Sequence, residues 1–369
     1  MRVMICGGGT GGHIMPALAL TEYITLHHPH SALWYIGRRS SMEERLVTSE
    51  GLRFGSIHAA PFKKGFGLLK CVFLNLLGVI ESCFLILRHR PLDIIGFGGY
   101  ASFPLMLAGL LLRRNVVIHE ANALPGKAVT TLVKLGAKFA YGIDTGLPAL
   151  KALCDRAASK RGACMTGNPV RRSLLESVDL ARENFTGLQT DTPTLLVIGG
   201  SQGARFLNRI ICAACGKLHD GIPRLQIIHI TGAIDVDLVN NTYEMCDIPH
   251  YVTPFCDKMN VLYALASCVI ARAGAMTISE ICISAVPALL VPFPYAAEKH
   301  QHENAAFLAN AGGAIVIDQS DVSSELLVSQ LTSLMNDSGR VDRMAENNKR
   351  MAAPNAAAQL WEFARGCQA

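Results

Sequence analysis

A histidine beside a glycine-rich loop is the feature of this sequence best suited to catalysis. The run Gly7-Gly8-Gly9-Thr10-Gly11-Gly12-His13 follows an apolar segment and precedes a helical pattern. Glycines let the backbone approach a ligand closely, and a helix N-terminus attracts anions. His13 is expected where the loop enters the helix, a position from which it could act as a general base. Helix capping or packing is the alternative role.

A second loop of similar chemistry lies in the C-terminal half. Ala273-Gly274-Ala275-Met276-Thr277-Ile278-Ser279-Glu280 follows a short apolar run and is expected to begin a helix. The free N–H groups and positive dipole end of such a helix suit a diphosphate, and Glu280 suits ribose hydroxyls. The alternative is an ordinary helix start, in which Thr277 caps the helix and Glu280 completes a capping box.

The first loop also satisfies the G-x-G-x-x-G pattern of dinucleotide-binding proteins. That fingerprint usually includes an acidic residue at the end of the second strand, whereas here the second expected strand ends Gly37-Arg38-Arg39. Two arginines suit the 2′-phosphate of NADP, so an NADP-dependent oxidoreductase is one alternative function. That function does not explain a second glycine-rich loop at the start of a second domain of equal size.

Two polar segments have a spacing that could suggest a metal site. His300 and His302 diverge on a helix, so Gln301 and Asn304 between and beside them suit sugar hydroxyls better than a metal ion. Asp235-Val236-Asp237 resembles a metal-binding D-x-D, but it lies in a polar connection and we interpret it as surface. We expect neither a metal nor another cofactor.

Short β-rich runs alternate with helix-length segments, which is the pattern of βαβ units. The expected strands are Val3 to Cys6, Ala32 to Ile36, Ile94 to Phe97 and Val116 to His119, then Thr194 to Ile198, Gln226 to Thr231, Val269 to Ala271, Ala288 to Val291 and Ala314 to Ile317. A stretch with fewer strand signals separates the two series, and we place the hinge there, near Gly167-Asn168-Pro169.

The 369 residues fit two domains of ordinary size. We therefore predict an α/β protein of two Rossmann-like domains facing a central cleft. The N-terminal domain would cover residues 1–168 and the C-terminal domain residues 169–351. A helix at about 352–369 could pack back on the first domain.

Composition and charge reduce the number of possible functional classes but do not identify one. Half of the residues are hydrophobic and 17% are charged, which indicates a folded protein. The twelve cysteines lie in apolar runs without interleaved histidines, and no signal segment is evident, so we expect a reducing cytosolic compartment. The first 170 residues carry 19 Lys and Arg against 9 Asp and Glu. Such a basic half suits nucleic acid, anionic lipid or a pyrophosphate substrate.

The candidate membrane segment is the apolar stretch from Gly65 to Arg88. On a helical wheel its polar residues gather on one stripe, and they interrupt the run enough to argue against spanning. A second apolar run extends from Leu105 to Leu112. Cations flank both runs, namely Lys63, Lys64, Arg88, Arg90, Arg113 and Arg114. We expect peripheral attachment to anionic lipid, and the alternative is that both runs are core helices.

The order and spacing of these motifs resemble the MurG family of lipid-linked N-acetylglucosamine transferases over essentially the whole chain. The matching segments are the opening GGTGGH, Gly98-Gly99-Tyr100, His119-Glu120-Ala121-Asn122, Gly167-Asn168-Pro169-Val170-Arg171, Gly199-Gly200-Ser201-Gln202-Gly203-Ala204 and Gly274 to Glu280. The resemblance implies a GT-B fold, with the UDP-sugar bound mainly to the C-terminal domain and the acceptor to the N-terminal one. Ala121 is a departure, because the family usually has glutamine there.

The resemblance further implies inverting transfer of N-acetylglucosamine from UDP-N-acetylglucosamine to the muramyl 4-hydroxyl of undecaprenyl-pyrophosphoryl-N-acetylmuramyl-peptide, in peptidoglycan synthesis at the cytoplasmic face of the membrane. His13 would be the base. The implied donor contacts are Thr10, Gly11, Gly12, Asn122, Arg171, Ser201, Cys256 through its backbone, Ala275, Met276, Thr277, Ile278, Ser279, Glu280 and Gln301.

The implied partners are the UDP-sugar, the lipid-linked acceptor, an anionic membrane surface and other cell-wall enzymes, but not nucleic acid. A non-catalytic nucleotide-binding protein at the membrane surface is a third functional class that uses the same loops without turnover.

Overall fold

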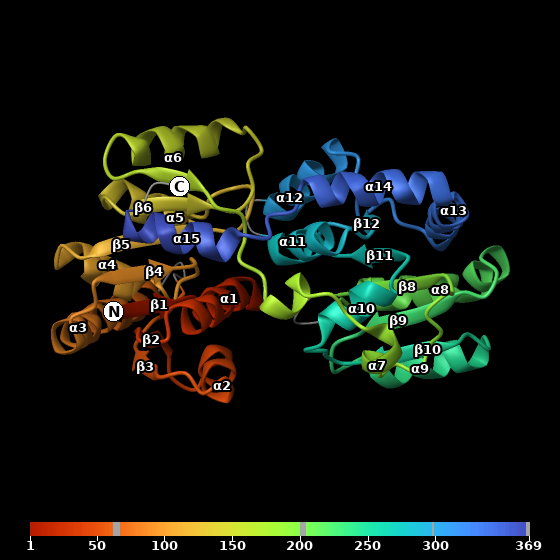
Figure 1. Ribbon diagram of the computed structural model, residues 1–369, viewed down its shortest axis with the longest axis horizontal. Coiled ribbons are helices and arrows are strands. Elements are labelled where there is room, and N and C mark those ends of the chain that lie inside the picture. The colour runs from red at the N-terminus through yellow and green to blue at the C-terminus, as the bar shows by residue number, and fades with distance from the viewer. Residues whose placement is uncertain (62–66, 200–203, 297–298, 367–369) are drawn as a thin grey trace. The chain divides into compact units, whose positions relative to one another are not determined.

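The chain forms two compact units, each built around one parallel β-sheet (Figure 1). The computed structural model describes residues 1–61, 67–199, 204–296 and 299–366. The first unit comprises Met1–Arg172 together with Ala353–Ala369, and the second comprises Ser173–Ala352. The chain therefore leaves the first unit once and returns to it at its C-terminal end.

The first unit holds a seven-stranded sheet in the order β3-β2-β1-β4-β5-β6-β7. Its strands are β1 (Arg2–Cys6), β2 (Ala32–Arg38), β3 (Phe54–Ile57), β4 (Asp93–Gly96), β5 (Asn115–Glu120), β6 (Lys138–Tyr141) and β7 (Ala163–Met165). The chain builds outward from β1 through β2 and β3, then crosses to β4 on the other side. The carboxyl ends of β1 and β4 thus form a switch point, where open α/β sheets bind ligands.

Helices cover both faces of this sheet. They are α1 (Gly11–His27), α2 (Met42–Ser49), α3 (Gly67–His89), α4 (Phe103–Leu111), α5 (Lys127–Leu135), α6 (Pro148–Ala158) and α15 (Ala356–Arg365). Along β1, Met4 and Cys6 join one buried cluster and Val3 and Ile5 join another, as the alternation of side chains across a strand requires. Two-sided burial explains why these strands are continuous apolar runs in the sequence.

The second unit repeats the plan with a six-stranded parallel sheet in the order β10-β9-β8-β11-β12-β13. Its strands are β8 (Thr194–Ile198), β9 (Gln226–Ile230), β10 (His250–Thr253), β11 (Cys268–Ala271), β12 (Ala288–Leu290) and β13 (Ala314–Val316). Its helices are α7 (Leu180–Glu183), α8 (Arg205–Gly221), α9 (Val236–Met245), α10 (Met259–Leu265), α11 (Ala275–Ser284), α12 (His300–Asn310), α13 (Ser324–Met335) and α14 (Ser338–Arg350). The switch point lies between β8 and β11.

The prediction of two Rossmann-like domains is confirmed, and every strand expected from the sequence is present to within two residues. The strands that the sequence did not predict are β3, β6, β7 and β10. These are short, and all four lie at or next to a sheet edge, where partial burial weakens the apolar signal.

Helix α3 carries the middle of its polar stripe inward and its apolar face outward, whereas Lys70 and Arg88 at the two ends of the stripe are exposed. The Asn75 amide donates to the carbonyl of Ala60 (2.9 Å), and buried Ser82 donates to that of Gly78 (2.6 Å). A Cβ at Gly78 would overlap the carbonyl oxygen of His58. The outward residues are 57–80% exposed and follow helical spacing, namely Leu69, Phe73, Leu76, Ile80, Phe84 and Leu87.

By length and composition alone, α3 could cross a membrane, although its buried polar contacts hold it to the first unit. The sequence predicted two apolar runs that face either lipid or the protein core, and the structure shows that the two runs differ in burial. The second run lies in α4, where Leu105, Met106 and Ala108 are fully buried. That run is therefore core, and only its end, at Leu111, is exposed. Lys63 and Lys64 lie outside the described residues.

Helix α15 completes the core of the first unit. Leu360, Trp361 and Ala364 are buried in the same cluster as Val3 and Ile5 of β1. The side chains of Asn115 and Lys138 donate to the carbonyl of Ala364, at 2.5 and 3.3 Å.

Removing the Trp361 side chain should destabilise the first unit alone. We expect Trp361→Ala to cost about 3–5 kcal/mol, since it leaves a cavity in a packed core. Differential scanning calorimetry should show one unfolding transition shifted down and the other unchanged. Leu331→Ala, in the core of the second unit, is the matched control and should shift the other transition. Equal shifts of both transitions by Trp361→Ala would contradict separate cores.

Candidate active site

His13 lies in the first turn of α1, at the carboxyl end of β1. Its Nδ1 is 3.0 Å from the Thr10 hydroxyl oxygen. Thr10 is the N-cap residue of α1, yet its hydroxyl contacts this imidazole instead of capping the helix. If Nδ1–H donates to the hydroxyl, Nε2 retains its lone pair and can accept a proton. The His13 residue is half-buried.

The turn after β4 forms the wall beside this imidazole. A Cβ at Gly98 would lie 3.3 Å from His13 Cδ2, and one at Gly99 would lie 2.1 Å from the carbonyl oxygen of Gly8. Both glycines have positive φ angles, 78° and 75°, which other residues rarely adopt. Buried Ser102 donates to the Gly98 carbonyl (2.6 Å), and the Gly99 carbonyl is 3.0 Å away. The two turns thus hold each other in position.

Glu120 organises the loop that follows β5. It is 4% exposed, and its carboxylate accepts from the Asn122 N–H (3.0 Å), the Asn122 amide (3.1 Å) and the Gly126 N–H (2.9 Å). Ala121, where the family usually has glutamine, is buried, and its carbonyl accepts from the Asn168 amide at 3.1 Å. The first unit therefore brings Thr10, Gly11, Gly12 and Asn122 to the carboxyl edge of its sheet, at strands β1 and β5.

Buried His119 supports this edge as a neutral residue. Burial lowers its pKa to about 4, and its Nε2 bonds to the carbonyl of Gly167 at 2.9 Å.

Arg171 has a different setting from the other predicted donor contacts. Its guanidinium pairs with Glu22 (3.3 Å) and Glu50 (2.9 Å) of the same unit. Any ligand anion would compete with these two carboxylates for Arg171.

Helix α11 begins at the carboxyl end of β11 and presents its first-turn N–H groups. Its N-cap is Gly274, and no described side chain caps it. The alternative in which Thr277 caps this helix is therefore wrong, because Thr277 lies inside the first turn. Ala275 and Ile278 are buried toward the core, whereas Met276, Thr277 and Ser279 are partly exposed. Uncapped N–H groups and the helix dipole suit an anion here.

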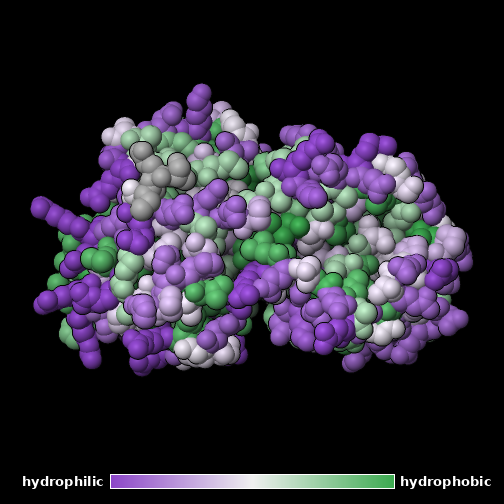
Figure 2. All heavy atoms as spheres, viewed as in Figure 1, coloured by the Kyte–Doolittle hydropathy of each residue, from purple (hydrophilic) through white to green (hydrophobic). Residues whose placement is uncertain are grey.

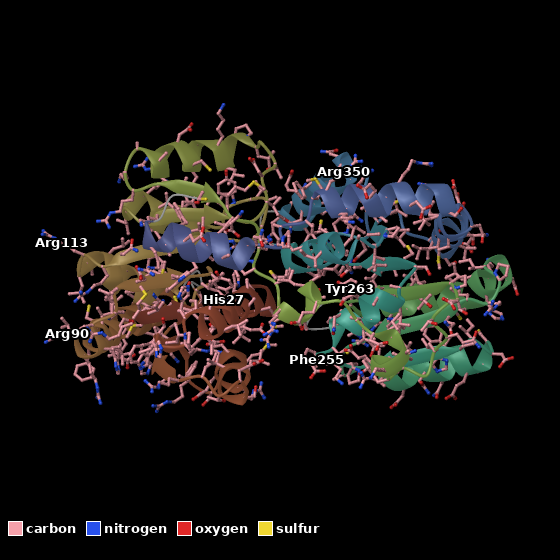
Figure 3. All side chains as sticks on the ribbon, viewed as in Figure 1. His27, Arg90, Arg113, Phe255, Tyr263 and Arg350 are labelled. Carbon is pink, nitrogen blue, oxygen red and sulfur yellow. The ribbon has the colours of Figure 1, made fainter. Side chains whose placement is uncertain are left out.

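Glu280 lies one turn further along α11 and accepts a hydrogen bond at 3.1 Å from Tyr263 of α10, which is labelled in Figure 3. Burial raises the pKa of Glu280 to about 7. A carboxylate held in such a poorly solvated position gains from any further donor, including a sugar hydroxyl. Tyr263 carries no signal in the sequence that would pair it with Glu280, because the two positions are 17 residues apart.

Arg272, between β11 and α11, is a second group that sequence reasoning missed. It is 8% exposed, and its guanidinium lies over the rings of Phe206 and Phe293, at 5.7 and 5.5 Å from their centroids. It donates to the carbonyls of Val291 (3.0 Å) and Pro292 (3.2 Å). Arg272 thereby fixes the segment after β12 and adds positive charge near the start of α11.

The polar cluster of α12 divides into two roles. Gln301, a predicted sugar contact, accepts from the Phe293 N–H at 2.9 Å and is partly exposed. Asn304, also expected to suit sugar hydroxyls, is fully buried and donates to the carbonyl of Ala273 at 3.0 Å. That expectation is wrong for Asn304, whose amide ties α12 to the turn before α11.

Of the two remaining predicted donor contacts, the structure describes Cys256 but not Ser201. Cys256 is partly buried after β10, beside Phe255, which is 60% exposed and whose carbonyl accepts from Thr253 at 2.8 Å (Figure 3). Ser201 lies outside the described residues. Asp235 is not a surface residue as the sequence suggested, since it is 4% exposed and accepts from the Asn208 amide at 2.8 Å. Among the described residues, no cluster of potential ligands is placed to hold a metal ion.

Comparisons with known proteins agree with this arrangement. Residues 3–140 match the glycosyltransferase family 28 N-terminal domain, and residues 194–360 match the C-terminal domain of that family. A UDP-N-acetylglucosamine–N-acetylmuramyl-(pentapeptide) pyrophosphoryl-undecaprenol N-acetylglucosamine transferase of Halothermothrix orenii is 36% identical, over 96% of this chain and 95% of that protein.

Solved structures support the same fold and family. The crystal structure of Acinetobacter baumannii MurG is 27% identical and covers 99% of both chains with a TM-score of 0.77. The calicheamicin glycosyltransferase, 15% identical with a TM-score of 0.65 over 99% of this chain and 98% of that one, shows likeness of fold alone. The family models and the Halothermothrix orenii relative are transferases, so the oxidoreductase alternative is not supported. The chain therefore belongs to the MurG family of hexosyltransferases within glycosyltransferase family 28.

Proposed function

We propose that this protein transfers N-acetylglucosamine from UDP-N-acetylglucosamine to the muramyl 4-hydroxyl of undecaprenyl-pyrophosphoryl-N-acetylmuramyl-peptide, with inversion at the anomeric carbon. Membership of the MurG family supports the donor and the acceptor. The observation that carries the chemistry is the imidazole of His13, held by Thr10 at the switch point of the first sheet.

In this reaction, the acceptor hydroxyl oxygen bonds to the anomeric carbon of the sugar as the bond from that carbon to the UDP oxygen breaks. The proton of the hydroxyl passes to a base, and His13 Nε2 is the group we assign. The Thr10 contact at Nδ1 supports this assignment, because it can fix the tautomer in which Nε2 is unprotonated. The neutral, buried His119 is unsuited to the role, since its Nε2 is already bonded to Gly167.

The departing UDP carries the negative charge that must be stabilised. The uncapped start of α11 supplies N–H groups and a dipole for the diphosphate, and Glu280 supplies an acceptor for ribose hydroxyls. On the partly exposed side of the same turn lie Met276, Thr277 and Ser279. The remaining proposed donor contacts are Gln301, Ser201 and the backbone of Cys256. These groups make a metal ion unnecessary for charge stabilisation.

We further propose that the outward face of α3 holds the protein to the cytoplasmic face of an anionic membrane, where its lipid-linked acceptor lies. Figure 2 shows hydrophobic atoms at the left margin, over α3 and α4, with hydrophilic side chains projecting beside them. Arg90 and Arg113 extend outward at this margin (Figure 3). An apolar helix face bordered by cations is the arrangement that binds anionic lipid surfaces. Other cell-wall enzymes at the same membrane are proposed partners.

Transfer of labelled N-acetylglucosamine from its UDP donor to lipid-linked muramyl-peptide tests the proposed function. We expect lipid-extractable label with the wild-type protein, with or without EDTA. His13→Ala should lower turnover by about 10²–10⁴-fold, the usual contribution of a general base, while the donor Kd changes little.

The matched control is His27→Ala, at the other end of α1 (Figure 3), which should leave turnover unchanged. Loss of donor binding in His13→Ala would replace the role of base with a role in binding. Intact UDP-sugar binding without any transfer by the wild-type protein would favour a non-catalytic nucleotide-binding protein instead.

Glu280→Gln should weaken donor binding and stabilise the ligand-free protein. Replacing a charged acceptor with a neutral one should raise the donor Kd about tenfold. Because burial raises the pKa of Glu280 to about 7, the folded state bears the cost of an ionised buried carboxylate above that pH but not in acid. We expect Glu280→Gln to add up to about 3 kcal/mol of stability at pH 8 and little at pH 5.

Thermal unfolding between pH 5 and pH 8, with calorimetric titration of the donor, measures both effects. Glu325→Gln is a suitable control, because Glu325 is exposed at the start of α13 and away from the proposed donor contacts. A stability gain in Glu280→Gln that is the same at both pH values would contradict the desolvation account.

Co-sedimentation with phosphatidylglycerol vesicles tests the membrane face. The triple variant Phe73→Ser, Ile80→Ser and Phe84→Ser should lower binding by about tenfold or more, since it removes three exposed apolar side chains from one helix face. High salt should also weaken binding of the wild-type protein. Met245→Ser, at an 88% exposed position of α9, is the control. Unchanged binding by the triple variant would rule out this face.

A further inference from the structure

Two cysteine thiols lie in contact between α8 and the end of α9, away from the residues assigned to the reaction. The Sγ atoms of Cys215 and Cys246 are 3.3 Å apart. A disulfide bond is about 2.05 Å long, so closing the pair needs a movement of only about 1.3 Å between the sulfur atoms.

The two thiols have different surroundings, which gives them different chemical roles. Cys215 is 2% exposed in the core of the second unit, and burial raises its pKa to about 12. Cys246 is the C-cap residue of α9, is partly exposed, and lies between the exposed residues Met245 and Asp247. A solvent-borne oxidant therefore reaches Cys246 first, and Cys215 remains a protonated thiol directly behind it.

We propose that Cys215 and Cys246 form a reversible disulfide when the protein meets hydrogen peroxide. Cys246 Sγ attacks a peroxide oxygen, which breaks the O–O bond and gives a sulfenic acid and one water molecule. Cys215 Sγ then attacks the sulfenic sulfur, the S–S bond forms, and the leaving hydroxide takes the Cys215 proton as a second water. Two thiols are oxidised and one peroxide is reduced. A dithiol reductant reverses the change.

The disulfide would fasten α8 to α9 without reaching the proposed donor contacts. Cys215 is ten residues beyond Arg205, the first residue of α8, which is about 15 Å along the helix. Helices of a parallel α/β sheet run back from the carboxyl edge, so the pair lies away from the edge that carries Glu280. The bond would close a loop between positions 31 residues apart and restrict the unfolded chain. The inference is independent of the proposed transferase function.

Mass spectrometry of the full-length protein, treated with hydrogen peroxide and then alkylated, tests the proposal. Trypsin leaves Cys212 and Cys215 on one peptide, 210–217, so variants must assign the partner of Cys246. We expect a peptide cross-linked to Cys246 in the wild-type protein and in Cys212→Ser. The cross-link should be lost in Cys215→Ser and in Cys246→Ser, and dithiothreitol should abolish it.

Thermal unfolding gives a second readout. Oxidation should raise the Tm of the second unit by roughly 5 °C or more in the wild-type protein and in Cys212→Ser, but not in Cys246→Ser. Donor affinity should be unchanged by oxidation. If Cys215→Ser folds poorly, Cys246→Ser alone carries the comparison, since Cys246 is partly exposed. A cross-link that persists in Cys215→Ser, or oxidation of Cys246 beyond the sulfenic acid without a cross-link, would overturn the proposal.

Discussion

Close backbone packing between the turns after β1 and β4 determines where His13 lies. A side chain at Gly7 would overlap the carbonyl of His13, and one at Gly99 would overlap the carbonyl of Gly8. Only glycine permits both approaches, and Gly99 also needs its positive φ. β1 and β4 are neighbouring strands, and the chain continues from β1 to β2 on one side of the sheet and from β4 to β5 on the other. The turns that follow β1 and β4 therefore meet at the carboxyl edge of the sheet. The position of the imidazole is thus a consequence of sheet topology as much as of local sequence.

Desolvation creates the corresponding constraint in the second unit. Glu280 and Arg272 are opposite charges near the start of α11, yet each finds its hydrogen bonds elsewhere: Glu280 with Tyr263, and Arg272 with two backbone carbonyls and Gln319. Burial shifts both pKa values toward the neutral forms. Charges held in this way favour a ligand that supplies the missing donors and acceptors, which is the electrostatic requirement for stabilising a departing diphosphate.

The fold and the main site elements could be predicted from the sequence because they depend on local signals. Buried parallel strands are apolar runs, and the glycine turns that follow them have a fixed spacing. Individual side-chain contacts could not be predicted in this way, whether they join separate elements or neighbouring residues of one loop. Tyr263 reaches Glu280, Ser102 reaches the Gly98 carbonyl and Glu120 gathers its loop through side-chain geometry that leaves no periodic pattern. The burial of Asp235 has the same cause, because its partner Asn208 lies 27 residues away in the sequence.

Helix α3 shows how the same residues can satisfy two opposite requirements. A polar stripe on an apolar helix usually faces water, but Asn75 and Ser82 bond inside the protein, where unpaired polar groups would be costly. Their burial leaves the apolar stripe outward, including Phe73 and Ile80, which are 66% exposed. Water makes that arrangement unfavourable, and an apolar surface would relieve the cost. The hydrogen bond from Asn75 to Ala60 therefore fixes the orientation of the helix, and that orientation, more than hydrophobicity itself, makes the face available for a lipid surface.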